Sequence, residues 1–470
     1  MFKRAYTFDD VLLTPQYSTL KTRKGIDTST ELVSGLRLKT PIVASNMDTV
    51  CESDMAIRMA EIGGIGIIHR YLSVEDQVAE VGLVKTHLNF ILSNPYTIHL
   101  HSSLEEAVDI MVEQNVSSLL VINNESQFSG ILGLKDATYV PGTLDNYKVT
   151  DAMVALEDVI TVSPTVTKSE ALNLMQNQRI GKLPVLNNDG TIYGLITRKT
   201  LNRDELHLEA TKDAKGRLAV GAAVGVTGDY LTRVKYLIRA GVDVLVLDIA
   251  HGHSIMSIEA LKAIKAEYGI PVIAGNVATA QGAIELAQAG ADGIKVGVGP
   301  GSICTTRIVT GHGVPQLTAI LDACNSVDIP IIADGGIRKS GDIVKALAAG
   351  ASTVMLGSLL AGTDESPGGV ITRDGSRYKM IRGMASYGAA LGRSKRAGDD
   401  VSEATPEGVE ALIPYRGSVD EIITNLMGGV RSGFSYSGAT CLAELWQNAE
   451  FVEISPAGLI ESRHHDVKDL

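Results

Sequence analysis

The stretch VDVLVLDIAHGHSIMSIEALKAIKAEYGIPVIAGN (242–276) predicts a strand, a helix and a second strand in direct succession. Its two ends, 242–248 and 271–276, are rich in apolar residues, which is typical of strands that are buried on both faces of a parallel sheet. Between them, 257–269 has the amphipathic pattern of a helix. A strand, a covering helix and a second parallel strand form the repeating unit of α/β folds.

The same unit recurs along the C-terminal half of the chain. Further strands are predicted at 293–299, 329–336 and 352–358, each separated from the next by a helix. Polar or glycine residues follow the strands, at Asp248, Asn276, Gly297 to Gly301, Asp334 to Gly336, and Gly357 with Ser358. All of these strand ends meet on one face of a closed barrel, where barrel active sites lie. A doubly wound sheet more often has one dominant glycine-rich turn near its start, so the pattern favours a (β/α)8 TIM barrel.

Residues 93–205 differ in character and contain an internal repeat. Met111 matches Met175 and Gly130 matches Gly194, each with an offset of 64 residues. Each copy is predicted to form a strand, a helix, a strand, a turn and a strand, and the pair resembles tandem cystathionine-β-synthase (CBS) motifs. Because 1–92 is too short to form a barrel, we expect 1–92 plus 206–470 to build it, with 93–205 as an inserted regulatory domain.

The composition limits the classes of partner. The 470 residues carry a net charge of −12, which argues against general nucleic-acid binding. No apolar run is long enough for a membrane span and MFKRAYTFDD lacks a signal-peptide pattern, so a cytoplasmic location without a membrane partner is expected. The four cysteines are far apart in the sequence, which argues against a disulfide framework or a structural zinc site.

The loop KVGVGPGSICTTRIVTGHGVPQ (295–316) has the strongest chemical signature. Closely spaced glycines expose backbone amides and carbonyls, which suit a phosphate, a cation or both. Cys304 would be a nucleophile there if the site lowers its pKa from about 8.5. A free cysteine is more often a small buried apolar residue, but the neighbouring hydroxyls and glycine-rich segments favour the nucleophile.

Two further glycine segments complete the predicted site. DGGIRKSGD (334–342) and MLGSLLAG (355–362) each place glycines after a strand, and a helix start supplies orphan amides to an anion. Consecutive units of this kind form the phosphate site common at the last strands of barrels. Asp334 would accept hydrogen bonds from ribose hydroxyls, and the alternative of a helix-capping role is weaker because the glycines begin immediately after it.

Over essentially its whole length the chain resembles the family of inosine-5′-monophosphate (IMP) dehydrogenase and guanosine-5′-monophosphate (GMP) reductase. The matching segments include YTFDDVLLTP (6–15), NMDTV (46–50), GGIGIIHR (63–70), GPGSICTTR (299–307), ADGGIRKSGDI (333–343), RGMAS (382–386) and GGVRSGFSYSGA (428–439). One departure is Ile381, where the family often has Tyr, which leaves one phosphate hydrogen bond without its donor.

The resemblance implies a set of roles. Cys304 would attack C2 of the purine to form a covalent thioimidate, with Thr306 and Glu407 relaying protons. The implied substrate contacts are Ser45, Asn46, Met47, Ser302, Asp334, Gly335, Gly336, Gly357, Ser358, Gly383, Met384 and Glu407. The implied contacts to the nicotinamide cofactor are Asp248, Ala250, His251, Asn276, Gly297 and Gly299. A potassium ion would be held by the carbonyls of Gly299, Gly301 and Cys304, together with Glu461 of a neighbouring subunit.

The segment between Met384 and Glu407 bears on which of the two reactions is catalysed. The dehydrogenases carry an Arg-Tyr pair there to activate water, whereas 385–406 has Arg393 and Arg396 with no tyrosine after them, and Tyr387 comes too early. Asn46 also resembles the reductases. The C-terminal segment SPAGLIESRHHD (455–466) and the CBS pair instead resemble the dehydrogenases. The resemblance therefore favours an NADPH-dependent GMP reductase that forms IMP and ammonia, and the alternative is an NAD-dependent IMP dehydrogenase that forms xanthosine 5′-monophosphate.

Other interpretations explain less of the sequence. A barrel aldolase would need a Schiff-base lysine, for which Lys295 is the one strand candidate, and would leave the cysteine loop unexplained. A nucleotide sensor on a degenerate barrel would not need Cys304. Within the CBS pair, Asp136 matches a ribose-binding position but its counterpart is Thr200, so one purine-nucleotide site is expected rather than two. The pair could also be a spacer without a ligand. The family implies homotetramers or octamers.

Overall fold

The computed structural model describes residues 2–201, 208–389 and 405–463. The chain divides into two compact units, one of Met1–His87 with Glu209–Leu470 and the other of Leu88–Leu208. None of the helices within the described ranges is long and apolar enough to cross a membrane.

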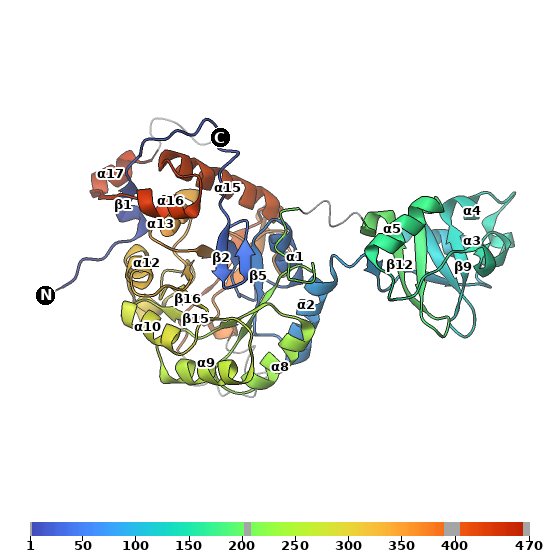
Figure 1. The fold of residues 1–470 in the computed structure, drawn as a ribbon, viewed down its shortest axis with the longest axis horizontal. Helices are drawn as coiled ribbons and strands as arrows, with labels where there is room; N and C mark the ends of the chain where they lie inside the picture. The colour runs from blue at the N-terminus through green and yellow to red at the C-terminus, as the bar shows by residue number, and fades with distance from the viewer. Residues whose placement is uncertain (1, 202–207, 390–404, 464–470) are drawn as a thin grey trace. The chain divides into compact units, whose positions relative to one another are not determined.

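The first unit is built on a closed barrel of eight parallel strands (Figure 1). In barrel order the strands are β13 (Gly221–Val224), β14 (Val244–Leu247), β15 (Val272–Val277), β16 (Gly293–Val296), β17 (Ile331–Asp334), β18 (Thr353–Leu356), β4 (Ile42–Ala44) and β5 (Ile65–Ile68). Two strands thus precede the second unit in the sequence and six follow it. The predicted (β/α)8 barrel is confirmed.

Within the described ranges, eight helices pack around the strands. They are α1 (Ser53–Glu61), α2 (Val74–Thr86), α8 (Tyr230–Ala240), α9 (Ile255–Glu267), α10 (Ala280–Gln288), α12 (Gln316–Cys324), α13 (Ser340–Ala348) and α15 (Val419–Tyr436). Local signals set several of their ends. The side chains of Ser254 and Thr279 accept hydrogen bonds from the first turns of α9 and α10, and α8 ends at Gly241 in the left-handed conformation.

The strands are shorter than the sequence predicted. β16 ends at Val296 and β17 at Asp334, whereas strands to 299 and 336 were expected. Gly297 and Gly335 have φ angles of 149° and 90°, so the backbone leaves the extended conformation at these residues. The glycines therefore begin the loops of the site rather than end the strands.

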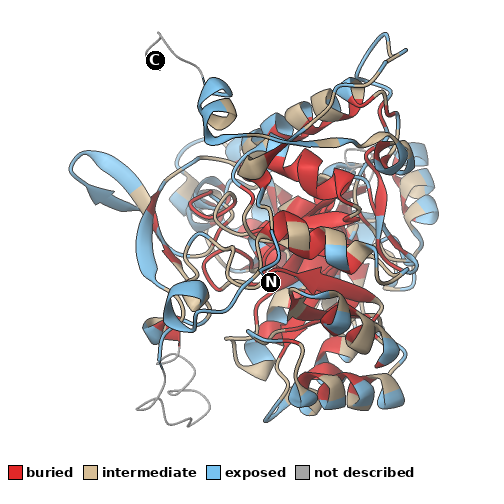
Figure 2. Cartoon of the chain, turned by 90° about the vertical axis from the view of Figure 1, so that its left-hand side faces the viewer, coloured by how far each residue is buried: buried red, intermediate tan, exposed pale blue. Residues whose placement is uncertain are grey.

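The barrel core is filled with aliphatic side chains and closed at one end. β2 (Thr30–Val33) and β3 (Leu36–Leu38) form a hairpin whose Leu32 and Leu38 join the same buried cluster as Val244 and Ile332. A Cβ placed on Gly293, the first residue of β16, would lie 3.4 Å from the Leu32 carbonyl oxygen. The hairpin thus covers the amino ends of the strands, and Figure 2 shows the buried residues concentrated in the strands and inner helix faces. The carboxyl ends remain for a site.

Smaller elements surround the barrel. β19 (Ile371–Arg373), β20 (Ser376–Arg382) and β21 (Glu410–Pro414) form an antiparallel sheet in which Arg382 pairs with Glu410. The remaining elements of this unit are η1 (Phe8–Asp10), β1 (Val11–Leu13), α11 (Thr306–Val309), α16 (Leu442–Asn448), β22 (Phe451–Glu453) and α17 (Pro456–Glu461). β1 pairs with β22, so segments from near both chain ends lie side by side.

The second unit contains two runs with the same element order. The first is β7 (Thr97–His99), α3 (Leu104–Glu113), β8 (Ser118–Ile122), β9 (Phe128–Gly133) and α4 (Leu134–Thr138). The second is α5 (Lys168–Asn177), β11 (Lys182–Leu186), β12 (Ile192–Thr197) and α6 (Arg198–Leu201), with a parallel bridge from Val162 to Val185 in place of the β7–β8 pair. The repeated Met111 and Met175 are each 1% exposed in equivalent cores.

Short elements complete this unit. They are β6 (Ile91–Leu92), η2 (Leu144–Asn146), η3 (Val149–Asp151), β10 (Val154–Ala155) and η4 (Leu156–Asp158). The unit begins at Leu88 and ends at Leu208, so it extends beyond the predicted range 93–205 at both ends. On the N-terminal side it includes β6, which pairs with β12.

Candidate active site

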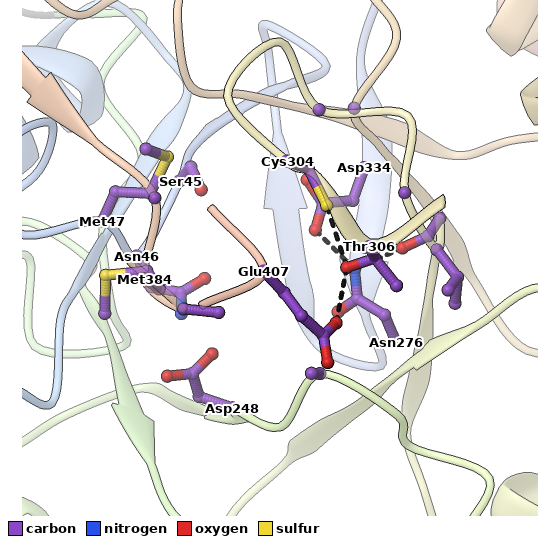
Figure 3. A pocket seen from close by; sticks show the side chains of 18 of the residues that line it. Ser45, Asn46, Met47, Asp248, Asn276, Cys304, Thr306, Asp334, Met384 and Glu407 are labelled. Carbon is purple, nitrogen blue, oxygen red and sulfur yellow. Dashed lines mark hydrogen bonds between the residues drawn. The ribbon is translucent and has the colours of Figure 1, made fainter. Parts of the chain in front are cut away.

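A cavity of about 460 Å³ opens at the carboxyl ends of the barrel strands. Its wall comes from residues at or just after the carboxyl ends of β4, β5, β14, β15, β16 and β17, together with Gly383 to Ala385 and Glu407. Figure 3 shows side chains from these separate loops converging around Cys304. The closed amino end and open carboxyl end place this cavity where barrel enzymes carry their chemistry.

Cys304, Thr306 and Glu407 form a chain of hydrogen bonds within the cavity (Figure 3). The half-buried Cys304 thiol donates to Thr306 Oγ1 at 3.2 Å, and that hydroxyl donates to Glu407 Oε2 at 2.8 Å. Thr306 therefore lies between a nucleophile and a carboxylate, an arrangement that can pass a proton in either direction.

Backbone pairing holds this arrangement in place. The Thr305 amide donates to the Glu407 carbonyl at 2.8 Å, and the Val409 amide donates to the Ile303 carbonyl at 3.0 Å. A Cβ on Gly408 would lie 3.2 Å from the Cα of Gly383, so a larger residue here would require the facing backbone to move by a few tenths of an ångström. The nucleophile loop and the segment that carries Glu407 are thus fixed against each other.

The glycine loop after β16 lies against the end of β17. A Cβ on Gly297 would fall 2.0 Å from the Asp334 carbonyl oxygen, a distance that no side chain tolerates. Asp334 in turn accepts hydrogen bonds at its Oδ2 from Lys295 Nζ at 2.7 Å and from Asn276 Nδ2 at 2.9 Å. Three neighbouring strands therefore contribute to the floor of the cavity.

Two further pairs shape the opposite wall. Arg70 Nε donates to Asp248 Oδ2 at 2.7 Å. Burial alone would lower the pKa of Arg70, but the charge of Asp248, its hydrogen bond, and the nearby Tyr71 and Asp229 together more than compensate, so that the pKa lies above its ordinary value. The Tyr71 hydroxyl donates to the Met384 carbonyl, which ties the end of β5 to the loop after β20.

Most of the residues implied by the family resemblance line this cavity. They are Ser45, Asn46, Met47, Asp248, Ala250, Asn276, Gly297, Gly299, Gly301, Cys304, Thr306, Asp334, Gly335, Gly383, Met384 and Glu407. Six others lie outside its lining: Ser302, Gly336, Gly357, Ser358, His251 and Glu461. Of these, Gly357 lies directly behind the wall, because a Cβ there would be 2.9 Å from Met47 Sδ. Arg393 and Arg396 fall outside the described residues.

Sequence reasoning missed Arg70, Tyr71 and the present role of Lys295. Arg70 and Tyr71 follow the buried strand β5, so the rule that polar residues after a strand build the site would have found them. From the sequence, Lys295 is only a candidate Schiff-base lysine of an aldolase. A lysine inside an otherwise apolar strand requires a buried partner, which was the available signal.

The chain is similar to known proteins along nearly all of its length. Residues 5–465 match the family described as IMP dehydrogenase / GMP reductase domain. The chain is 49% identical to an inosine-5′-monophosphate dehydrogenase of Nitrosopumilus maritimus, with 99% of each chain covered. It is 45% identical to a GMP reductase of Leishmania major, with 99% of this chain and 97% of that one covered.

A solved structure gives the same result. A cysteine-to-alanine variant of GMP reductase from Trypanosoma brucei, in complex with guanosine 5′-monophosphate, is 42% identical and covers 99% of each chain with a TM-score of 0.88. Relatives of both kinds thus match at similar identity. The chain belongs to the IMP dehydrogenase / GMP reductase family.

Proposed function

We propose that this protein is a GMP reductase, which converts GMP to IMP and ammonia with NADPH as the reductant. The observation that carries the proposal is the hydrogen-bond chain from Cys304 through Thr306 to Glu407. A reductase must protonate a leaving amine beside its nucleophile, and a carboxylate reached through one hydroxyl serves that need.

In the first step the Cys304 sulfur bonds to C2 of the purine and the bond between C2 and the amino nitrogen breaks. The thiol proton passes through Thr306 to Glu407, and Thr306 then returns it from Glu407 to the departing nitrogen, so that ammonia leaves and a thioimidate remains. The nicotinamide cofactor, when bound, supplies the hydride that C2 receives. The bond between sulfur and C2 then breaks, which releases IMP and leaves the Cys304 thiolate, and a proton from solvent restores the thiol.

The substrate would lie between the loops after β4 and β17. Asp334 and Gly335 would hold the ribose, and Ser45, Asn46, Met47, Gly383 and Met384 would surround the base. Ser302, Gly336, Gly357 and Ser358 would bind the phosphate. The orphan amides at the start of α13 suit a phosphate there.

The cavity wall beside Asp248 suits a nicotinamide ring. Ile249, Ala250 and Val298 supply apolar surface, and Asp248 is held by Arg70. A flat ring with one polar amide fits a wall of this composition. We assign Asp248, Ala250, Gly297 and Gly299 to cofactor binding, with His251 at the edge.

A monovalent cation would bind to backbone carbonyls of the nucleophile loop. Among the described residues no cluster of three or more His, Cys, Asp or Glu side chains offers a different metal site. Carbonyl oxygens suit potassium. The Gly301 carbonyl accepts one hydrogen bond from the Cys304 amide at 3.1 Å and keeps a second lone pair for a cation. Gly299, Gly301 and Cys304 would hold it, with Glu461 of a neighbouring subunit in a tetramer.

IMP dehydrogenase, with NAD as the oxidant, is the second candidate function. The 49% identity to the dehydrogenase of Nitrosopumilus maritimus favours it. Against it, the interval 385–406 has no tyrosine after Arg393 or Arg396 to activate water.

Two parallel assays distinguish the candidates. The reduced cofactor is followed by absorbance with GMP plus NADPH and, separately, with IMP plus NAD. The reductase oxidises NADPH in the presence of GMP and releases one ammonia for each NADPH consumed. Rapid formation of NADH from IMP, without GMP-dependent oxidation of NADPH, would identify the dehydrogenase instead.

The Leu88–Leu208 unit is proposed to be a regulatory CBS pair with one purine-nucleotide site. Asp136 is exposed and available to a ribose, whereas the Thr200 hydroxyl donates to the Thr197 carbonyl at 2.9 Å in a local turn. Deleting 93–205 should abolish any effect of purine nucleotides on turnover. An unchanged nucleotide response in the deletion variant would rule out regulation by this unit.

A further inference from the structure

Lys295 is the one charged residue of β16 and lies inside the barrel wall. Its side chain is 5% exposed, and a buried ammonium requires compensating partners. Its Nζ donates to Asp334 Oδ2 at 2.7 Å and to Asn276 Oδ1. These partners come from β17 and β15, the two neighbours of β16 in the barrel. The lysine thus joins three adjacent strands at the cavity floor.

The amide of Asn276 completes the arrangement. Its Nδ2 donates to Asp334 Oδ2 at 2.9 Å and to the Gly297 carbonyl at 2.8 Å, while its Oδ1 accepts from Lys295. Both N–H groups of the amide are therefore engaged with the chain itself, and Oδ1 keeps one lone pair. Within the described residues Asn276 contacts the carboxylate of Asp334, and the contact to the cofactor that the family resemblance implies stays a prediction.

The two oxygens of Asp334 differ in their surroundings. Oδ2 receives both donors, whereas Oδ1 has no hydrogen-bond partner within the described residues. Asp334 lines the cavity and its side chain is 20% exposed. Because Lys295 and Asn276 hold Oδ2 in place, Oδ1 remains available to a ligand with its two lone pairs.

We infer that Lys295 is a positioning residue that, with Asn276, orients Asp334 to recognise the two hydroxyls of a ribose. Two neighbouring hydroxyls can both donate to Oδ1, and a 2′-deoxyribose loses one of these bonds. A hydrogen bond to a charged group changes affinity by about tenfold to about a hundredfold. The site therefore selects ribonucleotides over 2′-deoxyribonucleotides. This inference rests on the proposed nucleotide substrate, but not on which of the two reactions follows.

The test measures the binding of GMP and 2′-deoxy-GMP to the full-length protein by calorimetry, without cofactor. The wild type should bind GMP about tenfold to about a hundredfold more tightly. Lys295→Met should reduce this preference to a small factor, mostly by lowering the affinity for GMP. Adding Lys295→Met to Asp334→Asn should have little further effect, since the lysine acts through the aspartate.

Lys265→Met is the matched control. Lys265 Nζ also contacts an aspartate, Asp292, at 2.8 Å, but neither residue lines the cavity. Lys265→Met should therefore leave the preference for GMP over 2′-deoxy-GMP unchanged. If Lys295→Met does not fold, as judged by circular dichroism, Asn276→Ala removes the second donor and should lower the preference in the same direction.

Two results would overturn the inference. One is an equal loss of affinity for both nucleotides in Lys295→Met, which would mean that the ammonium contacts another part of the nucleotide. The other is an unchanged preference in a folded variant. If neither GMP nor IMP binds to the wild-type protein at all, the proposed function fails and not the positioning role alone.

Discussion

Thr306 and Glu407 share a 2.8 Å hydrogen bond although 101 positions separate them in the sequence. Thr306 begins the short helix α11 after the nucleophile loop, and Glu407 lies just before β21 of the antiparallel sheet. The pairing of the two backbones at Thr305 and Glu407 makes this contact a fixed part of the fold. The reactivity of Cys304 therefore depends on a segment far from it in sequence.

Thr306→Val should interrupt the proton path while the shape of the side chain is retained. We expect kcat to fall by about a hundredfold to about ten-thousandfold, because general acid catalysis is lost, with little change in GMP binding. Steady-state kinetics and calorimetry measure the two effects. Thr305→Val is the control, since that residue contacts Glu407 through its backbone. Equal losses in both variants would contradict the relay.

Tyr71→Phe should loosen the loop that carries Met384. The hydroxyl that donates to the Met384 carbonyl is removed, and one such bond contributes about 0.5–1.5 kcal/mol. The KM for the nucleotide should rise by about twofold to about tenfold, with kcat nearly unchanged. A large fall in kcat at constant KM would instead give Tyr71 a part in the chemistry.

Alkylation by iodoacetamide near pH 8 should distinguish the cysteines. Burial raises the pKa of Cys324 to about 12 and raises the pKa of Cys51 as well, so both stay as unreactive thiols at this pH. Cys304 should be labelled and protected by bound GMP, as read by peptide mass spectrometry. Labelling of Cys441 serves as the control and should not respond to GMP. Labelling of Cys324 ahead of Cys304 would contradict this expectation.

Lys85→Met should destabilise the barrel. Lys85 Nζ contacts Asp243 at 2.6 Å and Asp213 at 3.1 Å, and burial already raises the pKa of Asp243. Without the ammonium, the buried carboxylate of Asp243 loses its cation, whereas Asp213 keeps Arg217 at 2.9 Å. Leaving Asp243 unpaired costs about 3–5 kcal/mol of unfolding free energy.

The loss of unfolding free energy in Lys85→Met should depend on pH. An acid whose pKa is raised by folding destabilises the folded state while it is ionised, so the deficit should be largest at neutral pH. It should shrink as the pH falls and Asp243 takes up a proton. The midpoint of thermal unfolding measures both effects. Arg4→Met breaks the exposed pair with Glu453 and should shift the midpoint little. A deficit that grows on acidification would contradict this account.

The barrel was predictable because its strands are mostly apolar and are followed by glycines or polar residues. The buried patterns of β14 and β18 follow directly from such sequences. The sheet that carries Arg382 and Glu410 was not predicted, because two of its three strands, β19 and β21, are largely exposed and have no clear alternation of buried and exposed residues. One signal was present: Asp374 and Gly375 both have positive φ, and Asp-Gly between two strands favours a hairpin.

The chemical residues were predictable in part. The cysteine loop identified Cys304 and Thr306, and the family resemblance added Glu407. The contacts among Lys295, Asn276 and Asp334 required the barrel register, which places β15, β16 and β17 side by side. Sequence alone gives each residue a position after or within a strand, but not the partner that its side chain selects.

The most direct test traces the hydride. The protein is incubated with GMP and NADPH carrying deuterium on the transferable position of the nicotinamide, and the nucleotide product is analysed by mass spectrometry. We predict IMP with one deuterium at C2, one ammonia released for each IMP, and no product from Cys304→Ala. The absence of labelled IMP, together with conversion of IMP and NAD to xanthosine 5′-monophosphate, would contradict the proposed reductase.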